Sequence, residues 1–283
     1  MIGKQEKLIR QYQDEDKKSE YMHQLLELLY RYGQTKSAPG LAEQIDQLYE
    51  EFWGNLKDYT LLKQQYNQLL LDKEADIEYH IRESSDCIKE CIKYVCAANY
   101  IDFSAVEHVN EQTCENLLEK AGNQTISEEE YLHFLNDLEA AGKLVYLTDN
   151  CGEIVLDKLF IRFIREKYPQ LQITVIVRGK NVINDATLAD AKEVGLTDLV
   201  PCIANGNGAP GTVLDRLSEE AKRVLEEADI IISKGQGNFE GLFSEGRNPY
   251  YLFLCKCELF VRRFGLNQYE SVFVKEERIN ILG

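Results

Sequence analysis

The segment Lys143–Lys158, KLVYLTDNCGEIVLDK, restricts the folds open to this chain more than any other segment. Its apolar run Leu144–Leu147 is typical of a buried strand, and this run ends abruptly at Thr148, Asp149 and Asn150. A Gly-Glu pair then opens an amphipathic segment that is typical of a helix. A strand that leads into a helix is the basic unit of α/β folds, which bind their ligands at the carboxyl edge of the sheet.

The chain after residue 140 repeats this alternation of short apolar segments and helical segments. The candidate strands are Leu144–Thr148, Ile173–Arg178, Leu199–Ile203, Ile230–Ser233, Tyr251–Cys255 and Ser271–Lys275. The candidate helices are Ile154–Tyr168, Ala186–Gly195, Ser218–Glu227 and Glu258–Phe264. Because continuous apolar runs such as ITVIV suit strands that are buried on both faces, we expect an α/β fold with a mostly parallel sheet.

The first half of the chain shows helical periodicity instead. Leu25, Leu26, Leu28 and Leu29 recur at helical spacing, and similar stripes follow up to about residue 140. We therefore predict two domains: a helical domain over residues 1–140, and an α/β domain over residues 141–283 that carries the functional site.

Composition limits the class of partner and the compartment. The net formal charge of −16 over 283 residues argues against nucleic acid or an anionic membrane as a partner. No apolar run approaches the roughly 20 residues that span a bilayer, and the N-terminus lacks the apolar core of an export signal. Eight cysteines without such a signal indicate reduced thiols, which predicts a cytoplasmic protein.

Polar residues and glycines follow successive predicted strands. Asp149 and Asn150 follow the first strand, and Asp185 follows the second. Because the carboxyl ends of parallel strands lie at one edge of a sheet, we expect these side chains to lie close together. They offer hard oxygen ligands, which suit Mg²⁺ or Mn²⁺.

Two lysines and the glycine-rich segments would add a phosphate site at the same edge. Lys234 and Lys256 would neutralise a phosphate as point charges. Backbone N–H groups in the glycine-rich loops Asn205–Thr212 and Lys234–Gly241 and at helix N-termini would hold its oxygens. A divalent cation beside a phosphoryl group and a bound water is the usual arrangement for metal-assisted phosphate hydrolysis.

Each of these residues also has a purely structural interpretation. Asp149 and Asn150 are favoured in turns and helix caps, and Asp185 would cap the helix that follows it. Asn99 and Asp102, in CAANYIDFSA, either end an apolar helix or extend from the helical part to the sheet edge, and the sequence leaves these interpretations level. The recurrence of polar residues at successive strand ends favours a site.

Five motifs resemble the signature blocks of the damage-control phosphatase family, which was formerly a domain of unknown function and is also called acidic-residue-methyltransferase-like. They are AANYIDFSA, TDNCGEIVLDKL, VRGKNVINDATLADA, GAPGT and ADIIISKGQGNFEGL, within residues 85–265. The last two motifs, GAPGT and ADIIISKGQGNFEGL, are similar to those of the family's stand-alone prokaryotic branch. This resemblance implies a helical N-terminal domain on a Rossmann-like α/β/α domain. It also implies a metal-dependent phosphatase, a phosphoric monoester hydrolase, that acts on small phosphorylated metabolites such as sugar phosphates.

The resemblance also implies roles for individual residues. The metal, Mn²⁺, Mg²⁺, Co²⁺ or Ni²⁺, would be held by the positions that match its ligands, Asp149, Asn150 and Asp185. Glu153 becomes a candidate for orienting water. The implied substrate contacts are Asn99, Asp102, Lys234, Gly235, Gln236, Gly237, Asn238, Glu240 and Lys256.

Two other functions compete with this prediction. The family's second name suggests a carboxyl methyltransferase that uses S-adenosylmethionine, but the glycine-rich loop expected after the first strand is replaced by Asp149–Glu153. The other alternative is a non-catalytic protein that binds a phosphorylated metabolite without turnover.

Overall fold

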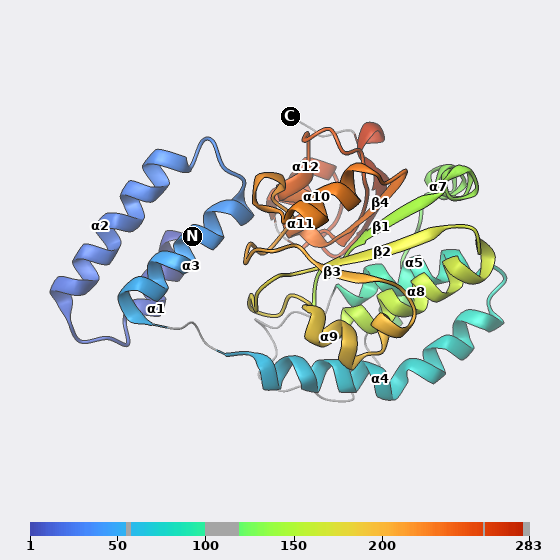
Figure 1. The fold of residues 1–283 in the computed structure, drawn as a ribbon, viewed down its shortest axis with the longest axis horizontal. Helices are drawn as coiled ribbons and strands as arrows, with labels where there is room; N and C mark the ends of the chain where they lie inside the picture. Colours follow the sequence, from blue (N-terminus) through green and yellow to red (C-terminus); the bar gives the residue numbers. More distant parts are fainter. Residues whose placement is uncertain (55–57, 100–118, 257, 280–283) are drawn as a thin grey trace.

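The computed structural model describes residues 1–54, 58–99, 119–256 and 258–279. Helices come first, and strands begin at residue 143 (Figure 1). The helices before the sheet are α1 (Ile2–Ile9), α2 (Glu15–Tyr32), α3 (Ala38–Trp53), α4 (Thr60–Glu83), α5 (Cys87–Ala98) and α7 (Glu128–Ala140). The later helices are α8 (Glu153–Lys167), α9 (Leu188–Glu193), α10 (Glu219–Glu226), α11 (Gly235–Leu242) and α12 (Glu258–Phe264), with 3₁₀ turns η1 (Leu196–Asp198), η2 (Leu214–Arg216) and η3 (Glu276–Arg278).

A six-stranded sheet forms the centre of the fold, in the order β3-β2-β1-β4-β5-β6. Its strands are β1 (Lys143–Leu147), β2 (Gln172–Val177), β3 (Cys202–Ala204), β4 (Ile230–Lys234), β5 (Tyr250–Leu254) and β6 (Ser271–Lys275). Neighbouring strands are parallel except β5 and β6, which are antiparallel. The predicted α/β fold with a mostly parallel sheet is confirmed. The strand order reverses between β1 and β4, the position where doubly wound sheets leave a crevice for ligands.

Helices cover both faces of the sheet. In β1, Leu144 and Tyr146 join the core that also contains side chains of α4, α5, α7 and α8, whereas Val145 and Leu147 join the core of α10, α11 and α12. Successive side chains of a strand point to opposite faces, so a strand covered on both faces is apolar throughout. This packing is the physical reason for the continuous apolar runs in the sequence.

Helices α1, α2 and α3 form a small core of their own around Tyr21, Leu25 and Tyr49 and lie to one side of the other elements (Figure 1). Helix α3 contacts α11, and the Gly208 N–H donates a hydrogen bond to Glu43 Oε1 at 3.0 Å. Helices α4, α5 and α7 instead share a core with the sheet. The division into two domains at residue 140 stays a prediction. No helix within the described ranges is long and apolar enough to cross a membrane.

Helix α11 occupies a segment that the glycine-rich sequence suggested would be a loop. Glycine is unfavourable inside a helix, but α11 contains glycines at positions where a side chain has no room. A Cβ on Gly237 would lie 2.2 Å from the Pro210 carbonyl oxygen, and a Cβ on Gly241 would lie 2.1 Å from the Thr212 carbonyl oxygen. Close packing against the GAPGT segment therefore requires these glycines, and the tertiary contact overrides helix propensity.

Strand β3 also differs from its prediction. It covers Cys202–Ala204, whereas the sequence suggested Leu199–Ile203. The N–H groups of Leu199 and Val200 both donate to the Leu196 carbonyl, so the chain remains in a helical turn where a strand was expected.

We predict that Asp46→Asn stabilises the protein at pH 8 and has no effect at pH 4. Burial raises the pKa of Asp46 to about 6; Glu50 and Glu43 on its own helix also raise it, and Lys4 of α1 lowers it. Tyr21 of α2 also faces this carboxyl. An acid whose pKa is raised on folding costs stability progressively as pH rises above its unfolded pKa, and the cost is complete above the folded pKa. After allowance for solvent screening, the gain should be about 1 kcal/mol at pH 8, measured by urea unfolding. A pH-independent difference would contradict this prediction.

Candidate active site

The predicted site lies where the strand order reverses, between the carboxyl ends of β1 and β4. Asp149 and Asn150 come just after β1, and Lys234 is the last residue of β4. The Ala186 N–H donates a hydrogen bond to the Asp149 carbonyl at 2.8 Å. Asn150 and Asp185 form an isolated antiparallel bridge. Main-chain bonds therefore join the two loops that carry the three predicted metal ligands.

Each predicted ligand leaves one oxygen uncommitted. Asp149 Oδ2 accepts hydrogen bonds from Asn99 Nδ2 at 2.9 Å and from Asn150 Nδ2 at 2.8 Å. Asp185 Oδ2 accepts one from Arg178 Nε at 2.6 Å. From the residues that the structure describes, no hydrogen bond reaches the Oδ1 atom of Asp149, Asn150 or Asp185. Two carboxylate oxygens and one amide oxygen thus remain for a hard divalent cation such as Mg²⁺ or Mn²⁺.

The amide of Asn150 is needed for this ligand set. Over the described ranges, no three His, Cys, Asp or Glu side chains gather as a metal site. The predicted set therefore combines two carboxylates with an amide oxygen. Such a set contains only hard oxygen donors, and a divalent cation bound to it would take its remaining ligands from water or substrate.

Burial dominates the electrostatics of these ligands. The carboxylates of Asp149, Glu153, Asp157 and Asp185 lie among the cations Arg178 and Lys234, and Lys256 and Lys63 also act on Asp149 and Asp185 respectively. Burial, together with the charges of Glu153 and Asp185, raises the pKa of Asp149 to about 7. Burial also raises the pKa of Asp185, against the lowering effect of Arg178. In both groups burial outweighs the neighbouring cations, so a bound divalent cation would favour the ionised form of these carboxyls.

Glu153 orients the amides that contact Asp149. It is the first residue of α8, and its side chain is fully buried. Glu153 Oε1 accepts hydrogen bonds from Asn150 Nδ2 at 2.7 Å and Asn99 Nδ2 at 3.0 Å, and Glu153 Oε2 pairs with Lys234 Nζ at 3.1 Å. Both carboxylate oxygens are thus engaged by protein groups.

The start of α11 lies directly against Asp149. Gly235 has a φ of +81°, and a Cβ at this position would lie 2.1 Å from Asp149 Oδ2. Asn238 Nδ2 donates to the carbonyl oxygens of Thr148 at 3.0 Å and Lys234 at 2.7 Å, which ties α11 to the ends of β1 and β4. The glycine therefore allows the helix to approach the predicted metal ligand.

The predicted substrate contacts fall into two groups. Four of them are buried and hold other parts of the site: Asn99, Lys234, Gly235 and Asn238. Four are partly exposed: Gln236, Gly237, Glu240 and Lys256. Asp102 lies outside the described residues. The ammonium group of Lys234 is buried and pairs with Glu153 and Asp157. Because it is not exposed, this position favours a structural role for Lys234 over the predicted contact with phosphate.

Three residues that the sequence analysis did not select contribute to the site. Arg178, the residue after β2, is 2% exposed and pairs with Asp185. Asp157 lies four residues after Glu153, and this spacing of two acids on an apolar helix was a usable signal. Asn67 of α4 accepts a hydrogen bond from the Gly152 N–H at 2.7 Å, a contact between distant segments that no local pattern indicates.

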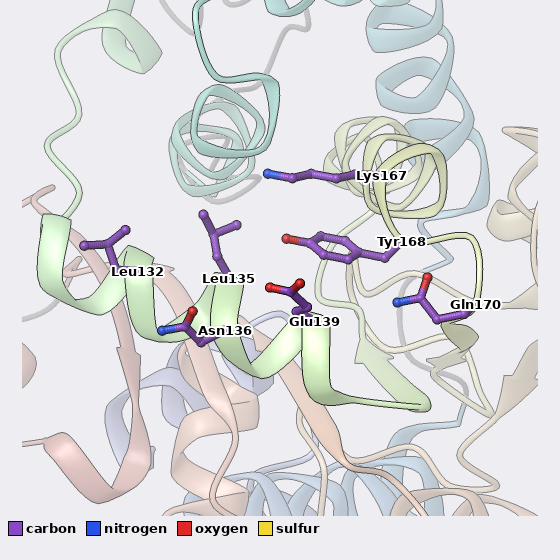
Figure 2. Close-up of a pocket in the computed structure, with 7 residues that line it drawn as sticks. All are labelled: Leu132, Leu135, Asn136, Glu139, Lys167, Tyr168 and Gln170. Carbon is purple, nitrogen blue, oxygen red and sulfur yellow. The ribbon is translucent and has the colours of Figure 1, made fainter.

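A cavity of about 450 Å³ lies elsewhere, between α7 and the end of α8. Figure 2 shows Leu135 and Glu139 of α7 facing Lys167 and Tyr168. The C-termini of these helices lead into β1 and β2, so the cavity is at the amino edge of the sheet, opposite the predicted ligands.

Known proteins resemble this chain over most of its length. Residues 1–272 match the family described as the damage-control phosphatase ARMT1-like domain. The chain is 30% identical over 263 residues to a damage-control phosphatase of Archaeoglobus fulgidus, covering 90% of this chain and 88% of the relative. It is 32% identical over 167 residues to a damage-control phosphatase of Pyrococcus horikoshii, covering 59% of this chain and 57% of the relative.

The fold also matches a solved structure. The crystal structure of a DUF89 family protein from Pyrococcus horikoshii has a TM-score of 0.79 to this chain at 27% identity, covering 97% of this chain and 95% of that one. The sequence and fold matches include the helical part as well as the sheet. The chain therefore belongs to the damage-control phosphatase family, which confirms the family and the phosphatase activity predicted from its motifs.

Proposed function

We propose that this phosphatase depends on a divalent metal ion, Mg²⁺ or Mn²⁺, held by Asp149, Asn150 and Asp185, and that it hydrolyses phosphomonoesters of small metabolites. The observation that carries the proposal is the set of three uncommitted oxygens on loops joined by main-chain bonds. The burial of Asp149 and Asp185 supports it, because a buried ionised carboxylate is costly unless a cation offsets its charge.

The chain's own residues would position the ester at this edge. When bound, the metal supplies Lewis acidity for a phosphoryl oxygen and lowers the pKa of a bound water. Lys256, partly exposed after β5, would attract the phosphate. The first N–H groups of α11 lack partners within the helix and suit the phosphate oxygens.

Two partly exposed side chains of α11 suit the organic part of the substrate. The carboxylate of Glu240 would repel phosphate but would accept hydrogen bonds from hydroxyl groups, and the amide of Gln236 both donates and accepts. Burial raises the pKa of Glu240. This pair favours a polyhydroxylated compound such as a sugar phosphate over an apolar ester.

Removal of the metal is expected to abolish turnover. Protein treated with EDTA and then dialysed should lose hydrolysis of p-nitrophenyl phosphate and of hexose phosphates, and Mn²⁺ or Mg²⁺ should restore both. The reason is that the carboxylates of Asp149 and Asp185 would repel the phosphoryl oxygens without a divalent cation to offset their charge. Released inorganic phosphate is the readout.

Two outcomes would contradict the proposal. Full activity in EDTA would exclude the metal-dependent mechanism. Recovery of intact ester after long incubation with metal would indicate a binding protein without turnover. Calorimetry with S-adenosylmethionine should show no binding, because the loop after β1 has polar side chains at Asp149 and Asn150 where a nucleotide-binding loop would have glycines.

A further inference from the structure

A buried ionic network lies behind the predicted metal ligands. Lys234 Nζ is 3.0 Å from Asp157 Oδ1 and 3.1 Å from Glu153 Oε2, and all three side chains are fully buried. Tyr146 OH, also buried, donates to Asp157 Oδ1 at 2.6 Å. β1, α8 and β4 each contribute to the network, so it joins the two strands at the point of reversal.

The network continues to the metal ligands without a gap. Glu153 Oε1, the oxygen that Lys234 does not hold, accepts hydrogen bonds from the amides of Asn99 and Asn150. Both amides also donate to Asp149 Oδ2. A line of direct contacts therefore runs from the hydroxyl of Tyr146 to two of the three predicted ligands.

Stability alone does not account for this network. A buried ion pair contributes little or no net stability compared with well-packed apolar side chains, because removing two charges from water is costly. In addition, Asp157 Oδ2 is buried and accepts no hydrogen bond from any described residue. A buried carboxylate with one unbonded oxygen is unfavourable for stability, but its charge holds the Lys234 ammonium group in a fixed direction.

We propose that Asp157, supported by Tyr146, is a positioning residue for the metal site. Asp157 holds the Lys234 ammonium group where it fixes Glu153, and Glu153 orients Asn150 and Asp149. This inference rests on the proposed metal-dependent function. Lys234 thus acts on the metal ligands from behind, through Glu153.

Two variants test the role of Asp157 and Tyr146. Asp157→Asn keeps an acceptor for Tyr146 but removes the charge that holds Lys234, and we expect Mn²⁺ affinity and kcat each to fall about 10- to 100-fold, as for other groups that orient metal ligands. Tyr146→Phe removes one hydrogen bond, and we expect about a threefold loss of Mn²⁺ affinity in the same direction. Calorimetric titration with Mn²⁺ alone and steady-state hydrolysis of p-nitrophenyl phosphate are the readouts.

Glu74→Gln is the matched control. Glu74 of α4 pairs at 2.7 Å with Lys158, the neighbour of Asp157 on α8, and the Lys158 side chain is also largely buried. This variant should lower the melting temperature of the metal-free protein but leave Mn²⁺ affinity and kcat within about twofold. If the network only stabilised the fold, all three variants would have a lower melting temperature and keep their Mn²⁺ affinity and kcat.

The outcomes separate the inference from the function on which it rests. Mn²⁺ affinity and kcat within twofold of wild type in both network variants would overturn the positioning role. If Asp157→Asn does not fold, Tyr146→Phe decides alone. Wild-type protein without metal-stimulated turnover would instead contradict the proposed function.

Discussion

Asp149→Asn and Asp185→Asn are expected to abolish metal-dependent hydrolysis, and Asp149→Asn should at the same time stabilise the metal-free protein. Each change removes a charged oxygen ligand, and we expect a loss of about 10³-fold in kcat, which corresponds to roughly 4 kcal/mol. Asp149→Asn also relieves repulsion with Glu153 and Asp185, so unfolding of this metal-free variant should require about 1 kcal/mol more than wild type. Asp185→Asn instead leaves the buried Arg178 without its charged partner and should not stabilise the fold. Released phosphate and thermal unfolding in EDTA measure the two effects.

Asp229→Asn is the control for this pair. Asp229 lies just before β4, at the amino edge of the sheet, and accepts hydrogen bonds from the N–H groups of Gly142 and Lys143. These bonds lower the pKa of its carboxyl. The control should lose stability and keep its kcat, whereas both site variants should lose kcat and Asp149→Asn should gain stability. Substantial turnover in Asp149→Asn and Asp185→Asn would remove the basis of the proposed metal site.

Gly235→Ala is expected to reduce kcat by about 100-fold or more, although it adds a single methyl group. The added Cβ would lie 2.1 Å from Asp149 Oδ2 and 2.2 Å from Asp149 Cγ, so the carboxyl group must move. A displacement of about 1 Å at a reacting site costs on the order of 10²-fold. Mn²⁺ affinity should fall with kcat, because the moved group is a proposed ligand.

Gly246→Ala separates this clash from backbone strain. Gly246 has a φ of +74°, similar to that of Gly235, but a Cβ there meets nothing within 4 Å. Both variants should lose about 1 kcal/mol of stability from the left-handed backbone conformation, and Gly246→Ala should keep wild-type kcat and Mn²⁺ affinity. Equal kinetic losses in the two variants would show that the contact with Asp149 is unimportant.

Most of the sheet was predictable because parallel strands buried on both faces have a simple pattern. The runs KLVYL, QITVIV and YYLFL lie in strands within one residue of their predicted ends. The pattern was insufficient where tertiary contacts outweigh local preference. In α11, glycines at 237 and 241 suggest a loop, yet the neighbouring GAPGT backbone makes glycine the residue that fits a helix there.

The proximity of the proposed metal ligands was predictable for the same reason. Asp149, Asn150 and Asp185 were expected at one edge because parallel strands end on the same side, and the two loops are joined there. Both the direction of the strands and the oxygen atoms of these side chains can be inferred from the sequence. Strand periodicity and oxygen chemistry were therefore sufficient to propose a metal-binding edge.

The contacts and burial of each polar residue could not be predicted from the sequence, and only the folded chain shows them. Lys234 was expected to meet phosphate, but it lies buried between Glu153 and Asp157, while Asn99 reaches Asp149 from a helix fifty positions away. Burial and long-range contacts depend on how helices pack across the sheet, and no local pattern records that packing. The sequence thus supplied the proposed ligands, and tertiary packing determined which charged side chains are buried behind them and which stay partly exposed.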